Sequence, residues 1–201
     1  MPATDRIVWI DCEMTGLVVG RDQLVEIACI VTDGNLVELD DGVAMVIAAP
    51  QDLLDQMDPV VVTMHTESGL IDEIPGGITI AEAERRVLDY VRQHVPVERS
   101  APLAGSSVYV DRGFLAVAMP ALDAHLHYRL IDVSSIKELA KRWYPRAYFS
   151  TPTKTGNHRA LGDVRDSIAE LRHYRQAIMV PGAAETTIVG AEASKSQDPA
   201  H

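Results

Sequence analysis

The distribution of short apolar runs over the first 48 residues constrains the fold of this chain more than any other feature. Each run has the length of a β-strand, about four to eight residues, and turn signals separate the later runs. These signals are Asp33-Gly34-Asn35 and Asp40-Asp41-Gly42, which are typical of tight connections. The pattern predicts an antiparallel meander of three strands, drawn from the apolar runs at 7–10, 24–31, 36–39 and 43–48.

Beyond residue 50 the apolar residues recur mostly at helical spacing. Pro50 and Pro59 interrupt a stretch in which short helices are expected, and Thr79 is a suitable N-cap for a helix over 80–95. Strands are predicted at 102–106 and 129–133, and helices at 111–126, from Ser134 or Ser135 to Arg142, and at 160–179. This order predicts an α/β fold in which helices flank a mixed sheet.

Length and composition limit the class of protein. The 201 residues suffice for one domain, predicted over 1–180, and the small and polar residues 181–201 are expected to form a flexible tail. The first residues lack the pattern of a signal peptide, and no apolar stretch has the length of a membrane span. With only Cys12 and Cys29, a disulfide framework is not expected. These features favour a cytoplasmic protein.

The charge balance bears on the partners of the protein. Lys and Arg number 18 against 29 Asp and Glu, which gives a net charge of −11. This balance disfavours a long basic groove that would hold many phosphates of a nucleic acid. It does not exclude nucleic acid as a substrate.

Asp11 and Glu13 are the first candidates for chemistry. They stand two residues apart after an apolar run, so the period of a strand places both carboxylates on one face. Two adjacent carboxylates repel each other unless a cation lies between them, and Mg²⁺ and Mn²⁺ prefer oxygen ligands. The alternative from this segment alone is a solvated strand end before the turn at Thr15-Gly16.

Two further segments carry candidate residues. Asp111 follows a predicted buried strand, where ligand sites gather in α/β sheets, although a helix dipole also favours an acid there. His158 and Asp163 are five residues apart, about 140° around a helix, too far to share a face. His158 is therefore expected in a loop folded back toward Asp163; the alternative is an exposed loop histidine and an acid that stabilises the helix start. Asp166 competes with Asp163 for any role.

Together these segments resemble a known family. Asp11-x-Glu13, Asp111 and His158-x₄-Asp163 occur in the order typical of the DEDDh 3′-to-5′ exonucleases. The strings WIDCEMTGL, GSSVYVDRGFL, HYRLIDVSSIKELAKRWYP and HRALGDVRDSI are similar to the oligoribonuclease family within that group. The resemblance extends over about residues 5–180.

The resemblance implies a ribonuclease H-like fold and a two-metal mechanism. Asp11, Glu13, Asp111 and Asp163 would hold two divalent cations, Mg²⁺ or Mn²⁺, and His158 would act as the general base. Histidine suits that role because its side chain ordinarily titrates near neutral pH. The expected reaction is the hydrolysis of short oligoribonucleotides, especially dinucleotides, to nucleoside 5′-monophosphates.

The resemblance also implies substrate contacts and a homodimer. Leu17 matches the apolar residue inserted between the terminal bases, His65 the residue beside the terminal nucleotide, and Ser107 a phosphate-facing serine. Tyr128, Arg129 and Ser134 match groups that a neighbouring subunit sends to the 5′ phosphate of a very short substrate. An arginine contact of this kind would favour short substrates over long ones.

The chain departs from the family pattern in two places. Val110 stands before Asp111 where relatives often carry glutamine, so one hydrogen bond to the substrate is expected to be missing. Val60 and Val61 stand where a tryptophan is often found, which puts aromatic packing near the terminal base in doubt. Two alternative functions stay open: a DEDDh exonuclease acting on longer single-stranded DNA or RNA ends, and a dinucleotide-binding module without hydrolysis.

Overall fold

The computed structural model describes residues 5–153 and 158–180. A five-stranded sheet with the strand order β3-β2-β1-β4-β5 lies at its centre. The strands are β1 (Arg6–Met14), β2 (Leu24–Asp33), β3 (Val43–Val46), β4 (Pro102–Gly105) and β5 (His127–Asp132). β1, β2 and β3 pair antiparallel, whereas β4 pairs parallel with both β1 and β5. The predicted mixed sheet is confirmed.

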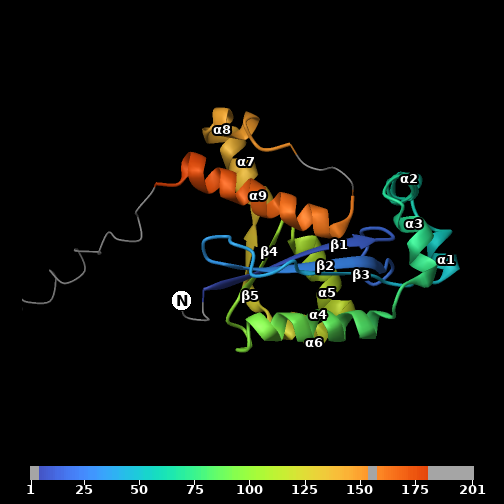
Figure 1. The fold of residues 1–201 in the computed structure, drawn as a ribbon. Coiled ribbons are helices and arrows are strands. Elements are labelled where there is room, and N and C mark those ends of the chain that lie inside the picture. The colour runs from blue at the N-terminus through green and yellow to red at the C-terminus, as the bar shows by residue number, and fades with distance from the viewer. Residues whose placement is uncertain (1–4, 154–157, 181–201) are drawn as a thin grey trace, which may run out of the picture.

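Helices cover both faces of this sheet (Figure 1). One face carries α4 (Ile80–His94), α5 (Tyr109–Ala118) and α6 (Pro120–His125), and the other carries α7 (Val133–Trp143), α8 (Pro145–Phe149) and α9 (Ala160–Ile178). At one end of the sheet lie the short helices α1 (Gln51–Leu54), α2 (Pro59–Glu67) and α3 (Leu70–Glu73), followed by a 3₁₀ turn at Ile74–Gly76. No helix in the described part of the chain is long and apolar enough to cross a membrane.

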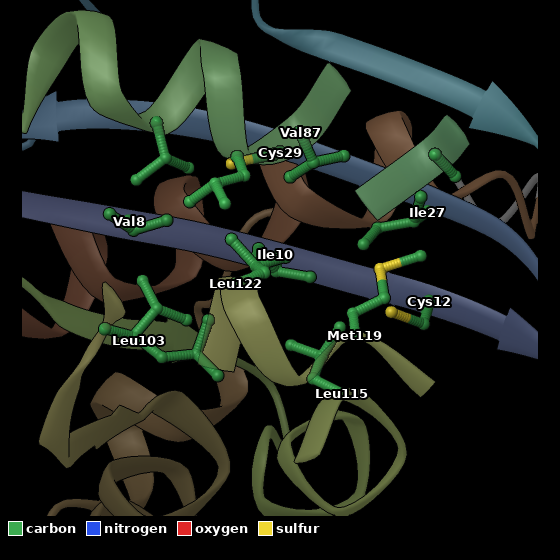
Figure 2. Packing of buried hydrophobic residues seen from close by; sticks show 14 of the residues in the cluster. Val8, Ile10, Cys12, Ile27, Cys29, Val87, Leu103, Leu115, Met119 and Leu122 are labelled. Atoms are coloured by element: carbon green, nitrogen blue, oxygen red, sulfur yellow. The ribbon is translucent and has the colours of Figure 1, made fainter. Parts of the chain in front are cut away.

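The alternation of side chains along β1 divides the core into two layers. Val8, Ile10 and Cys12 point toward the α4–α6 face and pack against residues such as Val87 and Leu115 (Figure 2). Trp9 belongs instead to the cluster under α9, which contains Ala28 and Ile30 of β2 and four residues of α9: Ala160, Val164, Ile168 and Leu171. Because Asp11 and Glu13 follow Trp9 at the same period, they also face α9.

Two of the predicted elements are wrong. Residues 36–39 form no strand: Leu36 has a left-handed φ of 68°, and the segment contributes only an isolated bridge between Glu38 and Thr32. The helix expected over 111–126 is divided in two, because Pro120 cannot continue a helix and instead begins α6.

The N-cap of α7 also differs from the prediction. It is Asp132, whose side chain accepts a hydrogen bond from the Ser134 backbone N–H, so neither Ser134 nor Ser135 caps the helix. The predicted N-cap at Thr79 is confirmed, since its hydroxyl accepts from Glu82 N. The expected tail, residues 181–201, lies outside the described residues.

Candidate active site

Three carboxylates meet between β1 and the first turn of α9. Asp11 and Glu13 come from β1 and Asp163 comes from α9, and one oxygen of each lies within 4.8 Å of the others. The packing of α9 on the same face of the sheet as Trp9 brings these distant segments together. A set of carboxylate oxygens at this spacing has the donor chemistry that Mg²⁺ and Mn²⁺ prefer.

Asp111 approaches the cluster from α5. Its Oδ1 accepts a hydrogen bond of 3.0 Å from the backbone N–H of Cys12, the residue between Asp11 and Glu13. Asp111 is not within the group of mutually close ligand atoms, but its charge acts on both Asp11 and Glu13. Of the four predicted metal ligands, the structure therefore gathers three and holds the fourth against the same strand.

The electrostatics of this cluster favour a cation. Burial, together with the charges of Asp111, Asp163, Glu13 and Glu26, raises the pKa of Asp11 from 3.8 to about 9. Burial and neighbouring carboxylates likewise raise the pKa of Glu13 to about 8, although Arg159 opposes the shift. Burial raises the pKa of Asp111 to about 7 against the hydrogen bond from Cys12 N. Protons thus neutralise this site where no metal does, so the residues fit a divalent cation.

His158 lies in the turn immediately before α9, as predicted. It is exposed, and its φ of 49° is left-handed, a conformation that non-glycine residues rarely adopt. It lines a hollow of about 490 Å³ together with residues of α2: Pro59, Val60, Thr63, Met64 and Glu67. Val60 is 74% exposed at the rim, where the family pattern led us to doubt aromatic packing.

His65 lies on the buried side of α2. Its Nε2 is 2.9 Å from the backbone oxygen of Met14, and its Nδ1 is 3.9 Å from Glu13 Oε2. The Nδ1 atom has no hydrogen-bond partner in the described structure. His65 therefore contacts the strand that carries the acid cluster and places one buried polar atom beside Glu13.

Leu17 lies on a loop that is held in shape by hydrogen bonds between residues of the loop. Its side chain is 73% exposed. Thr15 N donates to Gln23 O, and Asp22 Oδ2 accepts from Val18 N, so the loop is closed on both sides of Leu17. A Cβ on Gly16 would lie 2.4 Å from the Asp22 carboxylate, which explains the glycine.

The remaining predicted substrate residues lie toward the other edge of the sheet. Ser107 N donates to Asp132 Oδ1, and the Ser107 hydroxyl donates to the Ser134 hydroxyl at 3.0 Å. Tyr128 and Arg129 are exposed on β5, two strands away from β1, with the Arg129 guanidinium 5.5 Å from the centre of the Tyr128 ring.

Sequence reasoning missed the residues that anchor the start of α9. Arg159 pairs with Glu26 of β2 and Glu73 of α3, and the second Glu26 oxygen accepts from Ala160 N. Glu26 also lies directly opposite Glu13 in the antiparallel register of β1 and β2. The sequence contained one signal for this anchor: Glu26 is the single acid that interrupts the apolar run at 24–31.

Comparison with known proteins identifies the family. Residues 8–171 match the RNase_T exonuclease family. The chain is 61% identical to the oligoribonuclease of Streptomyces avermitilis, with 88% of each chain covered, and 55% identical to that of Leifsonia xyli, with 92% of this chain and 89% of the relative covered. The chain belongs to the oligoribonuclease family. The resemblance found in the motifs is thereby confirmed.

The oligoribonuclease architecture is also that of larger nucleases. A solved structure of exonuclease I matches with a TM-score of 0.69 at 13% identity. The match covers 87% of this chain but 41% of exonuclease I, so this chain spans less than half of that protein. At this identity the likeness concerns the fold alone, and it confirms the ribonuclease H-like arrangement.

The acid cluster predicts that cations stabilise the protein in a pH-dependent way. A raised pKa means that the folded state binds the proton more tightly. The contribution of Asp11 and Glu13 to stability is therefore full below about pH 4 and is lost as the pH rises through 8 to 9. We expect the melting temperature of chelator-treated protein to fall over this range, and Mg²⁺ or Mn²⁺ to restore it at pH 8 more than at pH 5.

Substitution separates this effect from general electrostatics. Asp11→Asn is expected to stabilise the metal-free protein at pH 8 by about 1 to 3 kcal/mol, because it removes a carboxylate with a raised pKa, and to weaken the response to metal. Asp89→Asn, on the exposed side of α4, is the control and should change neither quantity. Denaturation curves that are flat with pH and insensitive to both cations would contradict the assignment.

Proposed function

We propose that this chain is a metal-dependent 3′-to-5′ exoribonuclease that hydrolyses short oligoribonucleotides, especially dinucleotides, to nucleoside 5′-monophosphates. The observation that carries the proposal is the convergence of Asp11, Glu13 and Asp163, with Asp111 beside them, in a member of the oligoribonuclease family. The free and buried thiols of Cys12 and Cys29 suit the reducing cytoplasm in which we place this activity.

The four carboxylates would hold two divalent cations, Mg²⁺ or Mn²⁺. When bound, these cations stabilise the attacking and leaving oxygens of an in-line phosphoryl transfer. His158 takes the proton from the attacking water through its imidazole. Its exposure supports this role, because a general base must reach a solvent molecule beside the scissile phosphate.

The residues around the cluster would hold a short substrate. Leu17 projects from its closed loop with the exposure needed to enter between two bases, and the hollow lined by His158 and α2 offers space for a base. His65, which is buried beside Glu13, would lie next to the terminal nucleotide, as in the family pattern. The hydroxyl of Ser107 would face a phosphate at the start of α5.

The 5′ end would be bound by a second copy of the chain. Tyr128 and Arg129 are exposed on the edge strand β5, and the Arg129 guanidinium lies 5.5 Å from the centre of the Tyr128 ring, which prepares a cationic and aromatic surface for a terminal phosphate. Ser134 would join them, as in the family pattern. In a homodimer these groups would complete the partner's site rather than their own.

Loss of the proposed catalytic groups should abolish turnover without unfolding the protein. We expect His158→Ala to lower kcat for a dinucleotide by about 10²- to 10⁴-fold, the usual contribution of a general base. Asp163→Asn should remove detectable release of mononucleotides. Asp166→Asn, one turn further along α9, is the control and should retain near wild-type turnover. Retention of turnover by either of the first two variants would refute these roles.

Substrate length distinguishes this function from the main alternative. A solved structure of exonuclease I, which shares this fold, is a complex with a dT13 oligonucleotide. We expect kcat/KM to be at least about tenfold higher for a dinucleotide than for an RNA of about twenty nucleotides, because an end-capping arginine obstructs longer chains. Equal values would favour the alternative, and tight dinucleotide binding without hydrolysis would favour a binding module.

The shared site can be tested by mixing two defective dimers. Asp163→Asn removes a metal ligand, and Arg129→Ala removes the proposed 5′ contact. If Arg129 acts in the partner's site, a mixed dimer has one intact site of two, and random mixing restores about a quarter of wild-type turnover. If it acts in its own subunit, both sites stay defective and mixing restores nothing. Sedimentation of each variant should show a dimer.

A further inference from the structure

The side chain of Arg159 connects three parts of the fold at the point where α9 begins. Its Nε donates to Glu26 Oε1 at 3.0 Å, and its two terminal nitrogens contact Glu73 at 2.8 and 3.0 Å. Glu26 belongs to β2 and is only 2% exposed, whereas Glu73 ends α3 and is half exposed. One guanidinium thus fixes the start of α9 to both the sheet and the short helices.

The backbone around Arg159 is held by the same groups. Glu26 Oε2 accepts from Ala160 N at 3.0 Å, which replaces the side-chain cap that α9 lacks at its own N-cap position. The Arg159 carbonyl in turn accepts from Asp163 N and forms part of the first helical turn. Arg159 and the first helical turn that follows it are therefore fixed relative to β2.

His158 depends on this anchor because its own conformation is unfavourable. A left-handed φ of 49° in a residue with a Cβ persists only where the surroundings enforce it. The next residue is Arg159, and its bonds to Glu26 and Glu73 fix the chain immediately after His158. The pair with Glu73 also ties the turn to α3, next to the helix α2 that forms the opposite wall of the hollow at His158.

We propose that Arg159 is a positioning residue for the hydrolysis: its bonds to Glu26 and Glu73 hold the strained turn that presents His158. This inference rests on the proposed role of His158 as the general base. Arg159 itself touches neither water nor phosphate in this scheme. Its effect on the reaction therefore passes through His158 alone.

A competing explanation is that Arg159 acts through its charge. The guanidinium opposes the rise in the pKa of Glu13, which lies opposite Glu26 on the neighbouring strand. The two explanations make different predictions for lysine, which keeps the charge but cannot bridge two carboxylates in the geometry of a guanidinium. They also differ in whether the effect requires His158.

The kinetic test combines substitutions at both positions. We expect Arg159→Ala and Arg159→Lys to lower kcat for a dinucleotide by about ten- to hundredfold and to change KM by less than about threefold. In a His158→Ala background, neither change should lower the residual rate further. Glu73→Gln, which leaves the bond to Glu26 intact, should cause a smaller loss. Arg165→Ala is the matched control, because Arg165 makes an ion pair from the same helix with Glu38 and should leave kcat unchanged.

Hydrogen exchange tests the anchor independently of activity. The amides of residues 158–163 should exchange faster in Arg159→Ala and Arg159→Lys, but not in Arg165→Ala. Unchanged exchange, full activity of Arg159→Lys, or an undiminished loss in the His158→Ala background would each overturn the proposal. If the wild-type protein releases no mononucleotide, the proposed function fails, and the exchange result alone decides whether Arg159 anchors the turn.

Discussion

The packing of α9 across β1 and β2 is the interaction on which the site depends. Trp9, Ala28 and Ile30 form an apolar surface under Val164 and Ile168, and burial of such side chains is the main favourable contribution to folding. The same alternation that points Trp9 toward α9 points Asp11 and Glu13 there two and four residues later. Core packing thus decides where the carboxylates lie, and Asp163 meets them because its helix is fixed by apolar contacts further along.

The carboxylates that would bind a cation at the start of α9 destabilise the folded protein when no cation is bound. Burial and mutual repulsion raise the pKa values of Asp11 and Glu13, so the charged forms are costly in the absence of a cation. Arg159 offsets part of that cost, but its guanidinium is already engaged by Glu26 and Glu73. The remaining negative potential is available to a metal, and the apolar layer beneath α9 supplies the stability to hold it.

The sequence predicted best what depends on local pattern. Strand alternation placed Asp11 and Glu13 on one face, and the five-residue spacing placed His158 in a loop before the helix of Asp163. Prediction from the sequence failed where contacts between distant segments determine the local structure. The left-handed Leu36 ends a run that has strand composition, and the cap of α7 is Asp132 at the end of a strand. The partners of Arg159 lie 86 and 133 positions away, beyond the reach of any local pattern.

The negative net charge of the chain is compatible with a very short nucleic-acid substrate. A net charge of −11 repels a polyanion, and a protein that followed a long nucleic acid would need a line of basic residues. A substrate of two nucleotides presents few phosphates, so local charges outweigh the overall field at short range. Bound cations would reverse the sign of the carboxylate cluster toward the scissile phosphate, and in the proposed homodimer Arg129 of the second copy would meet the other end. The charge balance therefore disfavours a long basic track and agrees with the proposed action on very short RNA.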